Sequence, residues 1–168
     1  MNKSKRWESL SAGCVLIIMC SCSGTAIKPE QTGSVYEITV TAVFDHLYDS
    51  AYKLLEESNM FVVKELNIAA TLKRNKKKWG DNYNKNGYEE VRTLVLCNPW
   101  YANEVLNRTP RLMTLCPLAV SFLHKEGETT ILYGYRAPLA EGTSSYEIFR
   151  EIDSTIISAI KIAASLYK

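Results

Sequence analysis

Hydrophobic and polar residues alternate with two different periods along the chain from about residue 35 onward. Residues 35–41 (VYEITVT) alternate apolar and polar positions and are rich in β-branched side chains, which predicts a strand. Over residues 42–58 the period becomes that of a helix. We expect Thr41 to cap this helix and Asn59 to end it. Its predicted apolar face comprises Val43, Phe44, Leu47, Tyr48, Ala51, Leu54 and Leu55.

The same two periods recur in the rest of the chain. Further strands are predicted at residues 60–66, 91–97, 115–124 and 129–136. A helical turn is expected at 68–72, a helix after Asn98 to about Asn107, and a last helix at about 145–167. The apolar stripe of the last helix consists of Phe149, Ile152, Ile156, Ile160, Ala163 and Tyr167.

Local motifs mark where these elements begin and turn. Asn98-Pro99 is a helix cap motif, because Asn is a preferred N-cap and Pro a preferred first helical residue. Gly127 supplies the positive φ of a hairpin turn between the fourth and fifth strands. Ser144 with Glu147 resembles a capping box. The resulting order, β-α-β-β-α-β-β-α, predicts a single small α+β domain with a largely antiparallel sheet.

The first 21 residues have the features of a lipoprotein signal peptide. Lys3, Lys5 and Arg6 precede an apolar run of eight residues, which is too short to cross a membrane as a helix. Ser21 places a small residue before Cys22, so we expect lipidation at Cys22, a flexible tether over 22–34 and the domain over 35–168. Export with cleavage after Ala26 is the alternative, which would leave a soluble periplasmic protein.

This leader implies a cell-envelope location. Ser23 follows Cys22, with no acidic residue there, which favours the outer membrane and a domain that faces the periplasm.

The formal charge of +2 belongs to the leader. From Cys22 onward the chain has 17 basic and 17 acidic residues, which gives no reason to expect a nucleic-acid partner. One segment is locally basic: residues 73–90 hold a run of Lys residues together with Trp79. It is either a solvated loop or a contact with anionic lipid.

Residues 91–131 (VRTLVLCNPWYANEVLNRTPRLMTLCPLAVSFLHKEGETTI) resemble the core of the family called domain of unknown function 302. In that family a strand leads into an Asn-Pro-capped helix, and a segment with Leu, Pro and Cys opens a later strand. The resemblance extends from about Val35 to Tyr167 and implies a small α+β fold and a homodimer. It implies no reaction and therefore no catalytic residue. The order Cys116-Pro117 and a longer loop at 73–90 depart from the family pattern.

Cys97 and Cys116 are the only cysteines beyond the leader. They are two buried thiols, a disulfide, or a redox or ligand site; their spacing is not that of a zinc or CxxC motif. His46 and His124 lack metal-ligand spacing, so no metal is expected. No nucleophile or phosphate-binding motif is present, which argues against an enzyme and leaves no expected cofactor.

These features lead to one preferred hypothesis and two alternatives. The preferred hypothesis is a membrane-anchored envelope lipoprotein whose domain binds a small ligand or another envelope protein, as a homodimer. The first alternative is an envelope redox or cofactor-binding protein that uses Cys97 and Cys116. The second is an enzyme whose site the motifs do not reveal.

Overall fold

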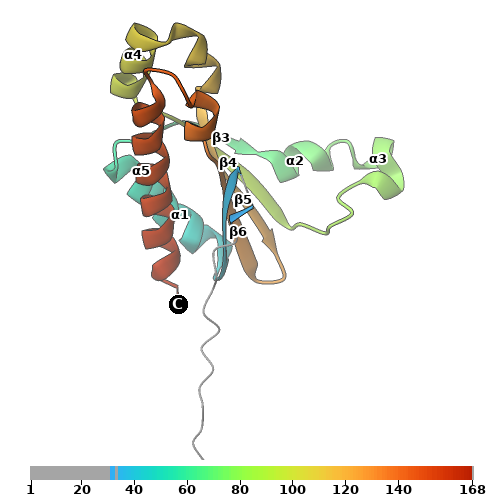
Figure 1. The fold of residues 1–168 in the computed structure, drawn as a ribbon. Coiled ribbons are helices and arrows are strands. Elements are labelled where there is room, and N and C mark those ends of the chain that lie inside the picture. Colours follow the sequence, from blue (N-terminus) through green and yellow to red (C-terminus); the bar gives the residue numbers. More distant parts are fainter. Residues whose placement is uncertain (1–30, 33, 168) are drawn as a thin grey trace, which may run out of the picture.

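A six-stranded antiparallel sheet, with two long helices on one of its faces, forms the body of the molecule (Figure 1). The computed structural model describes residues 31–32 and 34–167. The predicted signal peptide, Cys22 and most of the predicted tether therefore lie outside the described residues. The helices are α1 (Phe44–Glu57), α2 (Ile68–Lys73), α3 (Lys76–Trp79), α4 (Pro99–Arg108) and α5 (Tyr146–Ser165). The strands are β1 (Gln31–Thr32), β2 (Val35–Thr41), β3 (Phe61–Asn67), β4 (Glu90–Cys97), β5 (Leu118–Lys125) and β6 (Glu128–Gly134).

The strand order across the sheet is β1-β2-β6-β5-β4-β3. The predicted α+β class and antiparallel sheet are confirmed, and five of the strands are those expected from the sequence. The sixth, β1, is a two-residue pairing in which Gln31 lies opposite Tyr36. Strand β2 pairs with β6 along its whole length, although the two are about ninety residues apart in the chain. This pairing joins the first part of the described chain to its last strand within one sheet.

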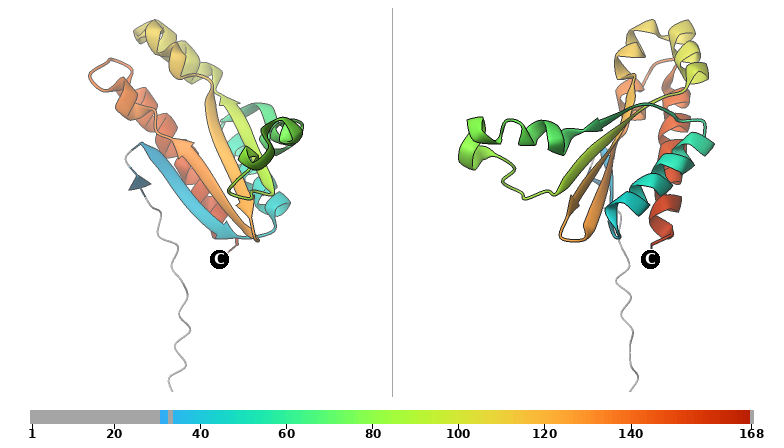
Figure 2. Two further views of the ribbon diagram at one scale, coloured as in Figure 1. Left: turned by 90° about the vertical axis from the view of Figure 1, so that its right-hand side faces the viewer. Right: turned by 180° about the vertical axis from the view of Figure 1, so that it is seen from behind.

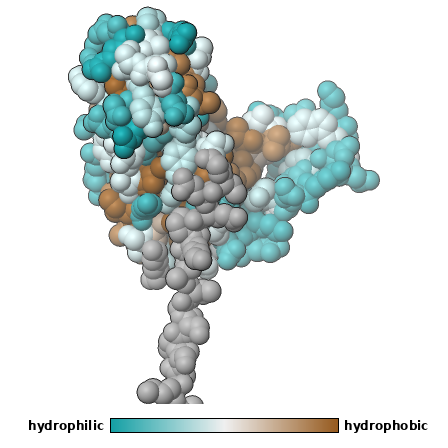
Figure 3. All heavy atoms as spheres, in the orientation of Figure 1, coloured by the Kyte–Doolittle hydropathy of each residue, from teal (hydrophilic) through white to brown (hydrophobic). Residues whose placement is uncertain are grey.

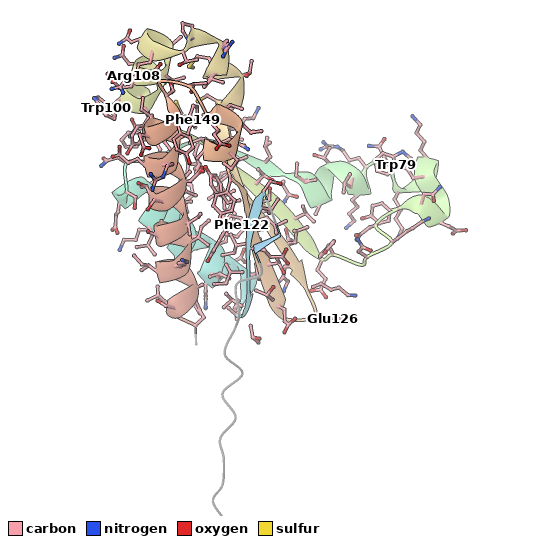
Figure 4. The ribbon with its side chains drawn as sticks, in the orientation of Figure 1. Trp79, Trp100, Arg108, Phe122, Glu126 and Phe149 are labelled. Atoms are coloured by element: carbon pink, nitrogen blue, oxygen red, sulfur yellow. The ribbon has the colours of Figure 1, made fainter. Side chains whose placement is uncertain are left out.

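The core fills the layer between the sheet and helices α1 and α5. Phe122 on β5 and Phe149 on α5 are fully buried there (Figure 4). Most of the predicted apolar faces are buried as expected, including Leu47 of α1 and Ile156 of α5. Val43 is an exception, because its side chain is 63% exposed just before α1.

Two predicted caps are wrong. Thr41 does not cap α1, because the Ala42 N–H donates to Gly127 O and keeps the chain beside the sheet, so the helix begins at Phe44. Ser144 does not form a capping box, because its hydroxyl contacts Thr109 Oγ1 at 3.1 Å, and α5 begins at Tyr146. Two other predictions are confirmed: Asn59 ends α1 with a φ of 58°, and Gly127 turns the hairpin with a φ of 80°.

Two strands are shorter than expected. The chain before β5 forms the 3₁₀ helix Pro110–Leu115, so the strand starts at Leu118, after the cis peptide bond Cys116–Pro117. Strand β6 ends at Gly134 because the Arg136 N–H turns away to bind the carboxylate of Asp153. A further 3₁₀ helix, Ala137–Ala140, follows and leads to α5.

Residues 68–88 leave the body as an arm, which we define by these bounds. The predicted helical turn is α2, and the predicted polar loop contains α3 and the 3₁₀ helix Gly80–Asn82. The arm projects from the face of the sheet opposite α1 and α5 (Figure 2). None of residues 71–88 is buried, so the arm contributes little to the core.

Candidate functional site

The two cysteines beyond the leader lie at the same end of the sheet. Cys97 is the last residue of β4, and Cys116 stands two residues before β5. The pairing of Leu96 with Leu118 brings these two strand ends side by side. Both cysteines are free thiols, and both are partly exposed. Tertiary structure therefore brings this predicted pair together, although the redox and disulfide roles stay predictions.

The surroundings of Cys116 keep its thiol protonated. Burial raises the pKa of the Cys116 thiol, and the neighbouring Cys97 raises it further. The guanidinium of Arg136 acts in the opposite direction but does not reverse the shift. Because the thiolate is the nucleophile and the metal ligand, this environment does not activate Cys116 for either chemistry.

A buried carboxylate lies beside the same strand ends. Asp153 of α5 is only 4% exposed, and it accepts a 2.7 Å hydrogen bond from the Tyr133 hydroxyl. It also accepts the backbone N–H of Arg136 at 3.0 Å and that of Ala137 at 2.9 Å. These bonds hold the chain that leaves β6 against α5, so Asp153 has a structural role. The sequence carried a signal for it, since a charged residue interrupts the apolar stripe next to Ile152.

A hollow of about 330 Å³ adjoins Asp153. Its lining includes Tyr135, Tyr146 and Ile157. Asp153 is already fully hydrogen-bonded, and Arg150 is engaged by Glu147 at 3.1 Å. The volume is at the lower end for ligand pockets, and the lining offers few free polar groups to orient a ligand.

The predicted cap motif has a structural role as well. Asn98 Oδ1 accepts from the N–H groups of Trp100 and Tyr101, and Pro99 is the first helical residue of α4. The Asn98 side chain also donates to Asn59 O at 2.9 Å, which ties α4 to the end of α1.

The histidines lie apart from each other and from the thiols. His46 is exposed on α1. His124 Nδ1 lies 2.8 Å from the buried Thr129 hydroxyl, and its Nε2 lies 3.9 Å from Glu89. Within residues 31–32 and 34–167 there is no group of three or more His, Cys, Asp or Glu that could hold a metal ion.

One surface feature that the sequence did not indicate is the sheet face opposite α1 and α5. We call it the open face. It is built by alternate residues of the four central strands: Val35, Glu37, Thr39, Thr41, Val91, Thr93, Val95, Cys97, Ala119, Ser121, Leu123, Lys125, Glu128, Thr130, Leu132 and Gly134. Its charged residues are Glu37 on β2 and the opposed pair Lys125 and Glu128 at the hairpin end of β5 and β6. All are at least partly exposed, and in the part of the chain that the structure describes no helix packs over the middle of this face.

Two hydroxyl pairs satisfy four of the polar side chains of the open face internally. Thr39 Oγ1 lies 2.9 Å from Thr130 Oγ1, and Thr93 Oγ1 lies 2.9 Å from Ser121 Oγ. Antiparallel sheets with one solvated face usually carry polar and charged residues on it. This face instead presents apolar groups such as Leu123 beside hydroxyls that already have partners. The middle of the face therefore resembles the centre of a protein interface, where charged residues are few.

No described helix has the length and hydrophobicity needed to cross a membrane.

Comparisons with known proteins agree with this fold. A search of curated protein sequences found no match. Among solved structures, the chain is similar to the crystal structure of uncharacterized conserved protein DUF302 from Bacillus stearothermophilus, with a TM-score of 0.65 and 16% identity. The alignment covers 79% of this chain and 98% of that one.

The sequence profile of one family matches residues 36–164. This match runs from the second residue of β2 to the second-last residue of α5 and includes the arm. The chain belongs to the family described as Domain of unknown function DUF302.

Proposed function

We propose that this protein is an envelope lipoprotein, anchored through Cys22, whose domain binds protein through the open face and forms a homodimer there. The observation that carries the proposal is the middle of the open face, where Glu37 is the one charged residue and where Lys125 and Glu128 lie only at the hairpin end. A sheet face with few charged residues at its middle can be covered by the same face of a second copy. An isologous pair of open faces is the simplest arrangement that buries both.

The dimer is tested by light scattering after size-exclusion chromatography of residues 27–168. We expect a dimer for the natural sequence and a monomer for Leu123→Glu, because the substitution buries a carboxylate in the apolar interface. The matched control is Ile162→Glu on α5, whose side chain is 51% exposed, and it should remain a dimer. A natural chain that stays monomeric at high concentration contradicts the dimer. Circular dichroism verifies that both variants fold.

The anchor rests on the sequence pattern at Ser21-Cys22 and is tested by the intact mass of the mature protein. A mature chain that starts at Cys22 and carries acyl chains supports lipidation. A chain that starts at Ile27 without added mass contradicts lipidation and favours the soluble periplasmic alternative.

The second candidate is an envelope redox or cofactor-binding protein that uses Cys97 and Cys116. The observation that favours it is the proximity of the two thiols, which is close enough for Cys97 to influence the pKa of Cys116. Thiol counting on protein purified from its native compartment tests this role. Two reduced, unreactive thiols and no bound chromophore contradict it.

A further inference from the structure

The near-neutral charge of the exported part conceals a segregation of charge between the arm and the body. The arm, residues 68–88, has six basic residues and one acidic residue, so its net charge is +5. The remainder of residues 34–167 has nine basic and fifteen acidic residues, so its net charge is −6. Figure 3 shows the arm as a largely hydrophilic projection beside the body.

The basic side chains of the arm are exposed and have no acidic partners. The five lysines Lys73, Lys76, Lys77, Lys78 and Lys85 are all exposed. No ion pair in the described part of the chain involves any of them, although carboxylates are abundant on the body. One weak contact is present, since Lys76 Nζ lies 5.5 Å from the ring centre of Tyr83. The positive charge of the arm is therefore available to an external anionic surface.

The kind of basic residue and its neighbours indicate the class of that surface. Five of the six cations are lysines, which act as hydrated point charges, whereas arginine prevails where planar, bidentate recognition of phosphate or carboxylate is needed. Trp79 follows three lysines directly and is 39% exposed near the end of the arm (Figure 4). Lysines beside an exposed tryptophan are typical of segments that rest in a membrane–water interface.

The shape of the molecule makes this contact selective for the arm. A body with a net charge of −6 is repelled by an anionic membrane, which disfavours contact through the body. Because the arm projects from the body, its lysines can reach a lipid surface while the acidic body stays in water (Figure 2).

We propose that the arm is a membrane-contact element that binds anionic phospholipid headgroups, with Lys73 and Lys76–Lys78 supplying the attraction and Trp79 entering the interface. This contact requires neither the Cys22 anchor nor the dimer, so its test is independent of the proposed function. If the chain is also anchored, the arm would hold the domain close to the membrane in a fixed orientation.

Co-sedimentation with lipid vesicles tests the proposal on residues 27–168. Residues 27–168 contain every helix and strand that the structure describes. Vesicles of phosphatidylcholine alone are compared with vesicles that contain about one third phosphatidylglycerol. We expect binding only to the anionic vesicles at about 0.05 M salt, and a large loss at about 0.5 M salt, where charge attraction is screened. Inorganic phosphate at constant ionic strength should not displace the protein.

Charge-reversal variants assign the binding to the arm. The triple variant Lys76→Glu, Lys77→Glu, Lys78→Glu should reduce partitioning by at least about 100-fold, since each removed lysine alone accounts for about fivefold. The matched control Lys53→Glu, Lys64→Glu, Lys161→Glu makes the same change in net charge on the body and should retain most of the binding. Trp79→Ala should weaken binding while leaving its dependence on salt unchanged.

Three results would overturn the proposal. One is a lack of binding to anionic vesicles at low salt, and another is equal loss of binding in the arm and body triple variants. The third combines two observations: the natural chain forms a dimer but does not bind vesicles, and the arm triple variant is a monomer. That result would show that the arm binds the acidic body of a second copy and not a membrane.

Discussion

The hydroxyl of Tyr133 donates a 2.7 Å hydrogen bond to the carboxylate of Asp153 in the interior of the domain. The two residues come from β6 and α5, and the same carboxylate binds the N–H groups of Arg136 and Ala137. The pair therefore joins the central sheet to the C-terminal helix and fixes the turn between them.

Removal of the Tyr133 hydroxyl should destabilise the fold. We expect Tyr133→Phe to lower the free energy of unfolding by about 2 kcal/mol, because a hydrogen bond to a buried charged group is lost. Tyr135→Phe is the matched control on the partly exposed neighbour and should change stability by less than about 0.5 kcal/mol. Urea denaturation measures both. Equal effects of the two substitutions would show that the hydrogen bond to Asp153 contributes nothing specific.

The same pair predicts a loss of stability in alkali. Burial and the Asp153 carboxylate raise the pKa of Tyr133 far above its usual value, so it stays protonated in the folded state. In the unfolded chain a tyrosine ionises near pH 10. The unfolded state then binds fewer protons than the folded state, so the contribution of Tyr133 is complete below about pH 10 and decreases above it.

The loss attributable to Tyr133 can be measured as a difference between two proteins. The stability difference between the natural chain and Tyr133→Phe should be constant below about pH 10 and shrink above it, by up to about 1.4 kcal/mol per pH unit. Urea denaturation at a series of pH values gives this difference. A difference that is independent of pH through this range would mean that Tyr133 ionises in the folded state as it does in the unfolded chain.

The Asn98 cap should contribute measurable stability. Asn98→Ala removes the acceptor of the Trp100 and Tyr101 N–H groups, and we expect a loss of about 1 to 2 kcal/mol in unfolding free energy. Asn98→Asp keeps this acceptor but loses the donor to Asn59 O, so it should recover most of the loss. If Asn98→Asp is as unstable as Asn98→Ala, the link to Asn59 and not the cap is the main contribution.

Cys116 should react slowly with thiol reagents in the reduced protein. Because its pKa is raised by burial and by Cys97, alkylation by iodoacetamide should have a pH midpoint above the ordinary value of 9.0. Cys97→Ala should lower this midpoint, and Arg136→Gln should raise it, since Arg136 favours the thiolate. Mass spectrometry after timed alkylation gives the rates at Cys116. A midpoint below the ordinary value would contradict the environment described here and favour a reactive thiol.

Local sequence signals predicted the elements well where only neighbouring residues are involved. The Asn98-Pro99 start of α4, the left-handed Asn59 and the turn at Gly127 depend on backbone geometry within a few residues. The predicted caps at Thr41 and Ser144 failed for a common reason. In both places a contact with a distant segment, Gly127 or Thr109, holds the chain in another arrangement.

The candidate sites depended more on tertiary structure. The sequence analysis singled out Cys97 and Cys116 by residue type, but their proximity follows from the pairing of β4 with β5. The open face was not predicted, because alternation within one strand does not reveal which of its two faces a helix will cover. The basic run near Trp79 was visible in the sequence, whereas its separation from an acidic body required the position of the arm.

By itself the sequence determined the α+β class, the order of the main elements and the family resemblance, because period and capping motifs act over short stretches of chain. Only the tertiary structure decided the strand order, the burial of Asp153 against Tyr133, and the exposure of the open face and the arm. These features arise from contacts between segments that are far apart in the chain, such as β2 with β6. Such contacts depend on how all the elements pack together, and no local pattern specifies them.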